Sequence, residues 1–372
     1  MSRVYIDRVY LSVSVSMGKL AVLSLAVVAL AVFIGERLVT LRHVALSYRE
    51  LTQNYLPNCH IIKGIECGSE DITIIDDGLA FLSTGVKAPG LPFCSDDPGK
   101  IYTLNLLDSE PKIKALSIKG DFDQDTFNPH GISVYTDDKD GAIYLFVINH
   151  PRGNSQVEIF EFVKDEHALK YIKTIKHELL HSVNDIVAVG TESFYATNDH
   201  YFSNEILKIV ENFLTLPWCD VIYYSPETVQ VVADGFLLAN GINLSLDKRY
   251  LYVSDVLKHS VVVLEIKKNT VLSRVKEIDV GSLADNIELD RESGDLWIGC
   301  HPNGFKFMLG DPNDPPGSEV IKIENIHSEK PRVTQVYSDN GSVIIASSVA
   351  APYRRKVLIG TVYHKVLLCD RK

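Results

Sequence analysis

The alternation of hydrophobic and polar residues divides the chain into an apolar start, a short amphipathic segment and a long series of short strands. Residues 20–35 contain no charge, and Lys19 alone separates them from the uncharged residues 9–18. As a helix, residues 20–35 measure roughly 24 Å, slightly less than a typical hydrocarbon core. This segment is compatible with a cleaved signal peptide, an uncleaved signal anchor or a buried core helix. We favour a retained anchor that spans residues 1–36.

The residues around this segment indicate its orientation. Arg3, Arg8 and Lys19 lie on its amino side, which favours a cytosolic amino terminus and a remainder exported into the secretory pathway. Residues 37–56 then place apolar side chains at a spacing of three to four, so a helix is predicted there. That helix either packs on the following domain or lies on a membrane or lipid surface.

From about residue 57 onward, one short pattern recurs: a polar residue or pair stands directly before an isoleucine that opens a strand. The recurrence has intervals of 45–60 residues. A sixth strand with a looser form of the pattern begins at Val333. Each of the six strands is followed by a turn rich in Gly, Asn or Asp and then by a second strand, and this order predicts a β-hairpin. The five isoleucines are Ile72, Ile132, Ile186, Ile242 and Ile287.

Six hairpins at this period predict an all-β fold, a six-bladed propeller over residues 57–372. A pair of sandwiches or a β-helix would not explain a polar element at one fixed place in every hairpin. Because the first strand of each blade lines the central channel, the polar elements are expected to meet at one mouth of it. Residues 201–218 interrupt the pattern with a predicted helical insert, which either packs on a blade or forms a lid or lipid-facing helix.

The polar residues that converge are four carboxylates and three amides, accompanied by one histidine. Such an all-oxygen set suits calcium better than zinc or copper. Any single one of them is explained by a turn hydrogen bond, but four carboxylates gathered without a cation would repel one another. The set is Glu70, Asp71, Asn184, Asp185, Asn240, Asp285 and Asn286, with His130.

Histidines supply the second candidate chemistry. His130 and His150 stand at the two ends of one hairpin, so they are expected to be neighbours that pass a proton. His200 and His301 end second strands in other blades and are expected to be structural. Without a Gly-x-Ser-x-Gly motif or a Cys/His nucleophile, we expect a metal-polarised substrate oxygen and an activated water, with no covalent intermediate.

The net charge and the cysteines indicate which partners and which cellular compartment this protein is suited to. The 372 residues carry a net charge of −11, which argues against nucleic acid as a partner. The six cysteines include no C-x-x-C pair, so a zinc ribbon or thioredoxin motif is not indicated. A bridge between Cys59 and Cys369 would close the fold in an oxidising compartment, and six free thiols are the alternative.

Several long motifs resemble the serum paraoxonase/arylesterase family, over about residues 17–369. They are residues 128–133 (NPHGIS), 180–190 (LHSVNDIVAVG), 197–202 (TNDHYF), 239–243 (ANGIN), 294–304 (GDLWIGCHPNG) and 330–337 (KPRVTQVY). The resemblance implies a six-bladed propeller with two calcium ions in its central tunnel. It also implies hydrolysis of lactones and aryl esters, with organophosphate triesters cleaved by some members.

Carried over residue by residue, the resemblance divides the ligands between two ions. The catalytic calcium is expected at Glu70, Asn184, Asn240, Asp285 and Asn286. The structural calcium is expected at Asp71, Asp185 and the backbone carbonyl of Ile132. His130 and His150 match the catalytic histidine pair, Cys59 and Cys369 match a disulfide, and Cys300 matches the single thiol of the family.

Other features fit the family less closely. Residues 1–16 precede the usual start, so Met17 is a second candidate initiation site. The longer form favours a membrane anchor over lipoprotein association. Cys67, Cys94 and Cys219 lie outside the expected pattern. Asn340 is a glycosylation candidate, whereas the sequon at Asn243 lies in an inner strand and is expected to be unused.

A function from another class is also compatible with the resemblance: a membrane-anchored, non-catalytic propeller that assists assembly of a membrane protein. The presence of every side-chain ligand and of both histidines favours the hydrolase over this alternative.

Overall fold

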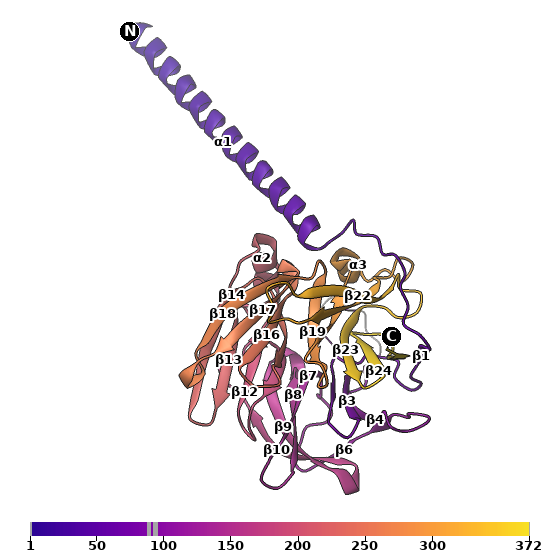
Figure 1. The fold of residues 1–372 in the computed structure, drawn as a ribbon. Helices are drawn as coiled ribbons and strands as arrows, with labels where there is room; N and C mark the ends of the chain where they lie inside the picture. The colour runs from indigo at the N-terminus through magenta and orange to yellow at the C-terminus, as the bar shows by residue number, and fades with distance from the viewer. Residues whose placement is uncertain (1, 88–90, 92–95, 372) are drawn as a thin grey trace. The chain divides into compact units, whose positions relative to one another are not determined.

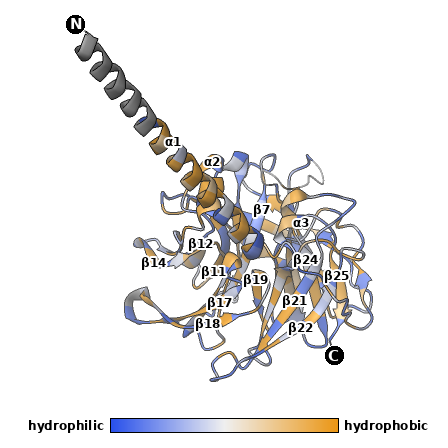
Figure 2. Cartoon of the chain, turned by 90° about the horizontal axis from the view of Figure 1, so that it is seen from above, coloured by the Kyte–Doolittle hydropathy of each residue, from blue (hydrophilic) through white to orange (hydrophobic). Residues whose placement is uncertain are grey.

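A computed structural model describes residues 2–87, 91 and 96–371, without the side chains of residues 2–18 and 269. The chain divides into two compact units, residues 1–43 and residues 44–372. The first unit is one helix, α1 (Ser2–Val44). Among the described residues, the part from Lys19 to Val44 is the one helix long and apolar enough to cross a membrane, a test that a signal sequence also passes. Figure 2 shows hydrophobic residues along most of the described part of α1, interrupted by a few hydrophilic ones.

The helix predicted over residues 37–56 ends at Val44, because the following residues are bound to the propeller instead. The Gly304 N–H donates to the Ala45 carbonyl (2.8 Å), and Asn54 exchanges two backbone hydrogen bonds with Ser338. The Arg49 guanidinium donates to both oxygens of buried Glu319, at 2.6 and 2.7 Å. Such long-range contacts override a helical spacing of apolar residues.

Residues 44–372 form a six-bladed propeller, as predicted (Figure 1). Given from the inner strand outward, blade 1 contains β2 (Ile72–Ile74), β3 (Leu79–Thr84), β4 (Lys100–Asn105) and β5 (Lys114–Ala115). Blade 2 contains β7 (Pro129–Thr136), β8 (Ile143–Asn149), β9 (Gln156–Val163), β10 (Ala168–Ile175) and β6 (Ser117–Lys119), which runs parallel to β10. Blade 3 contains β11 (Val183–Ala188), β12 (Phe194–Asn198), β13 (Cys219–Ser225) and β14 (Thr228–Phe236).

The remaining blades repeat the same antiparallel order. Blade 4 contains β15 (Ala239–Leu244), β16 (Tyr250–Asp255), β17 (Ser260–Ile266) and β18 (Leu272–Asp279). Blade 5 contains β19 (Leu283–Leu289), β20 (Leu296–His301), β21 (Ser318–Glu324) and β22 (Arg332–Asp339). Blade 6 contains β23 (Ser347–Tyr353), β24 (Lys356–Thr361), β25 (Leu367–Asp370) and β1 (His60–Ile61).

Blade 6 closes the ring with the two ends of the propeller chain. β1 pairs antiparallel with β25, so the first strand of the fold lies beside the last. The predicted disulfide between Cys59 and Cys369 is confirmed and links positions 310 residues apart. A closed ring leaves fewer sheet edges exposed to solvent than an open sheet does.

The sixth hairpin was placed wrongly by the sequence pattern. Residues 332–339 form β22, the outer strand of blade 5, and not an inner strand. The inner strand of blade 6 is β23, which begins at Ser347. The Asp339 carboxylate accepts the N–H groups of Val343 and Ile344, so the Asp-Asn-Gly sequence makes a capped turn between blades instead of a hairpin.

The helices and short turns lie between strands. α2 (Glu205–Leu214) occupies part of the segment predicted as helical over 201–218, and α3 (Gly304–Leu309) follows β20. The 3₁₀ turns are η1 (Pro151–Gly153), η2 (Lys164–Glu166), η3 (Val256–Lys258) and η4 (Lys268–Thr270).

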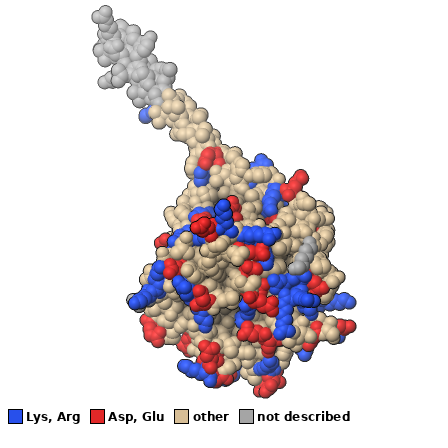
Figure 3. All heavy atoms as spheres, in the orientation of Figure 1, with Lys and Arg blue, Asp and Glu red and all other residues tan. Residues whose placement is uncertain are grey.

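The hydrophobic core consists of layers between neighbouring blades. Ile72 and Leu82 of blade 1, for example, pack with Val349 and Leu358 of blade 6. Such interlocked layers fix each inner strand against the next. On the face shown in Figure 3, acidic and basic side chains are interspersed over the propeller, which is typical of a solvated surface.

Candidate metal centre

Five of the seven predicted side-chain ligands lie at an irregularity shared by inner strands, whereas Glu70 and Asp71 directly precede β2. In blades 2 to 5 the ladder between the first two strands shifts register just before the isoleucine, as between Val183 and Ile186. A bulge of this kind frees two residues from regular pairing and redirects their side chains. The pairs it frees are His130 and Gly131, Asn184 and Asp185, Asn240 and Gly241, and Asp285 and Asn286.

All seven side chains expected to bind calcium are buried, and the most exposed of them, Asn240, retains 8% of its surface. Two of them contact each other, and two others contact neighbouring side chains. The Asn286 amide donates to Glu70 Oε1 (2.9 Å) and to the Glu70 carbonyl (2.9 Å). The Asn184 amide donates to Asp199 Oδ2 (3.4 Å), and His301 Nε2 lies 2.8 Å from Asp285 Oδ2.

Five of these side chains have a buried oxygen atom without a hydrogen-bond partner. Leaving such an acceptor unsatisfied costs about 1–3 kcal/mol for each group, so five together need a common explanation. A cation that takes oxygen ligands supplies one, and its donor set matches calcium. The atoms are Glu70 Oε2, Asn184 Oδ1, Asn240 Oδ1, Asp285 Oδ1 and Asn286 Oδ1.

Amide oxygens are essential to any such site. Among the described residues, no group of three or more His, Cys, Asp or Glu side chains is placed to hold one metal ion. Three of the five unpartnered oxygens belong to asparagine. The donor set therefore fits a hard oxygen-seeking cation and does not fit zinc.

Asp71 and Asp185 differ from the other five because both of their oxygens accept backbone N–H groups. Asp71 accepts from Ile72 of its own strand and from Ile132 of the next blade, each at 2.8 Å. Asp185 accepts from Ile186 (2.7 Å) and from Ile242 of the next blade (2.8 Å). Each carboxylate thus joins two inner strands, and Ile132, expected as a carbonyl ligand, lies beside Asp71.

The charges of these carboxylates oppose one another. Burial and then the charge of Glu70 raise the pKa of Asp71 to about 7. Burial and then the charge of Asp71 raise the pKa of Asp185 well above its ordinary value. Burial also raises the pKa of Asp285, although its hydrogen bond to His301 partly offsets that effect. A cation among them would relieve the repulsion.

Two glycines that the sequence analysis passed over make room for these groups. A Cβ on Gly131 would lie 2.5 Å from Asp185 Oδ1, and one on Gly241 would lie 2.5 Å from the Asp285 carbonyl oxygen. Both glycines follow the polar residue of their element and precede the isoleucine. A glycine between the polar residue and the isoleucine was therefore the sequence feature that could have identified these two residues.

His130 and His150 are paired, with 3.1 Å between His130 Nδ1 and His150 Nε2. His130 Nε2 lies 3.5 Å from Glu70 Oε1, and His150 Nδ1 lies 3.2 Å from Ser155 Oγ. Burial, the largest single effect, would lower the pKa of His130, but the charge of Glu70, its contact with the imidazole and the charges of Asp199 and Asp285 together outweigh burial and raise the pKa to about 9. Burial and the charge of His130 lower the pKa of His150 to about 3. A cation beside Glu70 would offset the charge that raises the pKa of His130, and so would favour its neutral, proton-accepting form.

Two histidines expected to be structural also contact this centre. His301 hydrogen-bonds to Asp285, while its Nδ1 is buried without a partner. His200 Nδ1 lies 2.8 Å from Asp199 Oδ1, and Asp199 in turn accepts from the Asn184 amide. Asp199 was not singled out from the sequence, although it follows the end of β12 as His150 follows the end of β8.

The remaining predicted positions are not candidate ligands. Cys219 and Cys300 are free and buried, Cys67 is disulfide-bonded, and Cys94 lies outside the described residues. Asn340 is exposed in the turn after β22, as an acceptor of a glycan must be. Asn243 is partly buried, and its amide donates to the Ile287 carbonyl (2.8 Å), so its sequon is held within the fold.

Comparison with known proteins gives one consistent result. The Arylesterase family model matches residues 50–371. Serum paraoxonase/arylesterase 2 of Rattus norvegicus is 53% identical over 355 residues, which cover 95% of this chain and 100% of the relative. Serum paraoxonase/lactonase 3 of Homo sapiens is 50% identical with the same coverage. A solved luciferin-regenerating enzyme shares the fold at 12% identity, with a TM-score of 0.50 over 84% of this chain and 94% of that one.

Proposed function

This chain belongs to the arylesterase family that includes the serum paraoxonases, and on that premise we propose that it is a calcium-dependent hydrolase of lactones and aryl esters. The relatives are named for arylesterase and lactonase activity. The observation that carries the proposal is the set of five buried oxygens without partners, which fit one oxygen-liganded cation. Cleavage of organophosphate triesters is a further activity to include in the tests.

Two groups of residues would hold two ions. Glu70, Asn184, Asn240, Asp285 and Asn286 would hold the catalytic calcium. Asp71, Asp185 and the Ile132 carbonyl would hold the structural one. When bound, the catalytic calcium would polarise the ester carbonyl and stabilise the oxyanion that develops on it.

The histidine pair supplies the proton transfer. His130 takes a proton from the water whose oxygen attacks the ester carbon, and the 3.1 Å hydrogen bond shares that proton with His150. The bond between the carbonyl carbon and the leaving oxygen breaks, and the proton returns to that oxygen. The products are an alcohol and a carboxylic acid that releases its remaining proton to solvent and becomes a carboxylate; both groups remain in one molecule when the substrate is a lactone.

The non-catalytic propeller is the weaker interpretation. A scaffold protein has no need for five unsatisfied buried acceptors beside a polarised histidine pair. Retaining them would cost stability without a function to offset the cost.

The apolar part of α1 is proposed to be an uncleaved membrane anchor, with the propeller in the secretory pathway or outside the cell. The disulfide between Cys59 and Cys369 agrees with an oxidising compartment. α2 offers a second membrane or lipoprotein contact, because Ile206 and Ile209 are 71% and 68% exposed and do not pack on a blade.

Replacement of a ligand tests the function. Asp285→Ala should lower turnover of a lactone, phenyl acetate and paraoxon alike, by at least about 100-fold, because it removes an oxygen from the centre. Turnover should be measured with calcium titrated from excess chelator, and chelation should also lower the melting temperature. Asp247→Ala, in an exposed turn after β15, is the control and should behave like the wild type. Full turnover in excess chelator would refute the proposal.

A further inference from the structure

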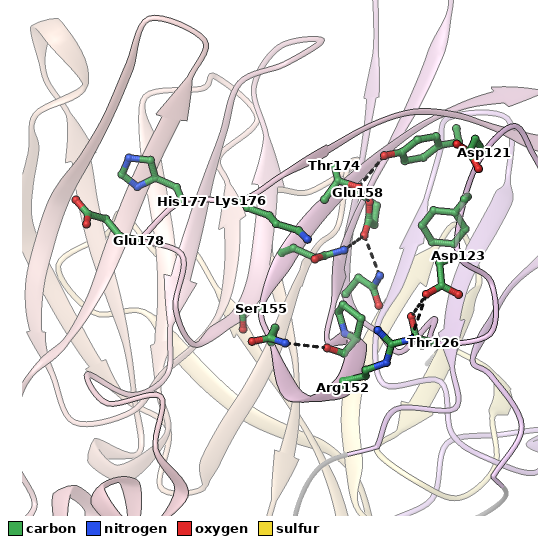
Figure 4. A pocket seen from close by; sticks show the side chains of 16 residues that line it. Asp121, Asp123, Thr126, Arg152, Ser155, Glu158, Thr174, Lys176, His177 and Glu178 are labelled. Carbon is green, nitrogen blue, oxygen red and sulfur yellow. Dashed lines mark hydrogen bonds and ion pairs between the residues drawn. The ribbon is translucent and has the colours of Figure 1, made fainter.

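A cavity of about 820 Å³ lies beside blade 2, and its lining includes Asn149 and Pro151, the neighbours of His150 in the chain (Figure 4). Ser155, whose hydroxyl contacts His150, and Asn149, which precedes His150 in the chain, are both part of its lining. Glu158 of β9 also lines it, although its side chain is completely buried. The proposed mechanism gives this carboxylate no role.

Glu158 accepts three hydrogen bonds, all from neutral groups. The donors are the Asn149 amide (2.8 Å), the Gln156 amide (2.5 Å) and the Thr174 hydroxyl (2.5 Å). A buried carboxylate is costly even when it is well hydrogen-bonded, and a glutamine of the same shape would be less costly to bury. The negative charge therefore calls for an explanation beyond packing.

The charge determines which way the Asn149 amide points. A carboxylate can only accept hydrogen bonds, so Asn149 must turn its NH₂ group toward Glu158 and its oxygen away. That oxygen accepts the Asn128 N–H at 2.9 Å. A neutral partner at position 158 could donate as well as accept, and the orientation of Asn149 would no longer be fixed.

Asn128, which is held by Asn149, in turn restrains the backbone near both histidines. Its carbonyl accepts the His150 N–H (3.0 Å), and its side-chain amide donates to the His150 carbonyl (3.3 Å). Asn128 also stands two residues before His130. The link from Glu158 through Asn149 thus holds the strand ends from which the paired imidazoles extend.

The same arrangement recurs in blade 3, where Asn198 occupies the position of Asn149. Its amide donates to Asp220 on the third strand (2.8 Å), and its oxygen accepts the Ser182 N–H ahead of the first strand (3.2 Å). There the held strand carries Asn184 and Asp185. Because blades 2 and 3 share this contact between an asparagine and a buried carboxylate, we infer that it fixes the position of the segment that leads into the inner strand.

We propose that Glu158 is a positioning residue for the histidine pair, acting through Asn149 and Asn128. The inference rests on the proposed function, because that function assigns proton transfer to His130 and His150. The charge at position 158 holds the two imidazoles at hydrogen-bonding distance, whereas the side-chain metal ligands belong to other strands.

Glu158→Gln tests the charge without changing the shape. We expect kcat to fall about tenfold for phenyl acetate, as the pair loses its alignment, while KM and the calcium affinity measured by titration calorimetry stay at wild-type values. The exchanged variant E158Q/N149D should recover most of the lost kcat. In it, the carboxylate introduced at position 149 again accepts the Asn128 N–H and can accept from the glutamine introduced at position 158.

Phe162→Leu is the matched control for stability. Phe162 lies on the same strand and packs edge-to-face on Phe81 (5.0 Å between centroids), outside the link to the histidines. It should lower the melting temperature without lowering kcat. Wild-type kcat in Glu158→Gln, or failure of the exchange to recover it, would overturn the proposal.

Two further variants separate the possible failures. Asn149→Ala interrupts the link without altering the carboxylate, so it decides the matter if Glu158→Gln does not fold, and wild-type kcat in it overturns the proposal. Turnover that survives His150→Ala refutes the proton-transfer role of the histidine pair, and absence of calcium-dependent turnover in the wild type refutes the proposed function itself. Loss of turnover in His150→Ala with wild-type kcat in Glu158→Gln refutes only the positioning role.

Discussion

At the scale of single residues, this propeller uses buried carboxylates as joints between neighbouring segments. Asp71 and Asp185 each accept one N–H from their own strand and one from the next blade. Asp290, which follows β19, likewise joins two segments, because it contacts both its own turn and Arg371 near the carboxyl terminus. It accepts from the Arg371 guanidinium at 2.6 Å and from the Glu292 N–H at 3.1 Å.

Asp290 gives a prediction about pH. Burial alone would raise its pKa, but the Glu292 N–H and Arg371 outweigh burial, so its pKa in the folded state lies below the ordinary value. A depressed folded pKa adds stability above the unfolded pKa of about 4, and that stability is lost as pH falls through the folded value. Asp290→Asn should therefore cost on the order of 2 kcal/mol at neutral pH and much less in acid.

The measurement is the melting temperature of both proteins from about pH 7 down to about pH 3. The gap between wild type and Asp290→Asn should narrow as pH falls. Glu329→Gln, at an exposed position between β21 and β22, serves as the control, and its difference in melting temperature from the wild type should stay constant with pH. A gap that widens in acid would contradict the assigned direction of the pKa shift.

At the scale of elements, the period of the hairpins predicted the number of blades but not every strand. Five inner strands were found because an isoleucine follows a polar pair whose chemistry the centre needs. The inner strand of blade 6, β23, has no such pair, and residues 332–339 imitated one beside an Asp-Asn-Gly turn. Position in the ring, and not local chemistry, decides which strand is innermost.

The centre was predictable to the extent that its residues are local. The ligand side chains stand next to recognisable strand starts, and all seven are buried. Asp199 and Glu158 gave no such signal, because their partners lie in other strands. The bulges that free the ligands also depend on pairing across two strands, which the spacing along one strand does not reveal.

The closure element gives a prediction about stability. Cys369→Ser should lower the melting temperature strongly, because the disulfide restrains a loop of 310 residues in the unfolded chain and such restraint contributes up to about 5 kcal/mol. The β1–β25 pairing should keep the ring closed at low temperature, so turnover there should persist. Cys300→Ser, at a buried free thiol, is the comparison. An unchanged melting temperature would show that strand pairing alone closes the ring.

At the scale of the whole molecule, the chain consists of two compact units. Residues 44–372 contain all the blades, the core layers between them and every candidate ligand. The first unit contains a stretch of α1 that is long and apolar enough to cross a membrane, and its most apolar window has no buried residue. Catalysis and attachment are therefore expected to separate.

Removal of residues 1–43 tests that separation. The shortened protein, exported by a cleavable signal peptide so that its disulfide forms, should keep wild-type kcat and KM toward phenyl acetate. The full chain should resist carbonate extraction from membranes, whereas the shortened one should be released. Residual binding of the shortened protein to phospholipid vesicles, if abolished by Ile209→Glu, would assign the remaining contact to α2.

The pairing of β1 with β25 also dictates an order of events during synthesis. The strand that begins the propeller is made first, yet its partner is the last strand of the propeller to be made. Five blades can form while the chain is still growing, but the sixth must wait with an open sheet edge. Termination before β25 would therefore leave a nearly complete propeller whose open edge is prone to pair with other chains.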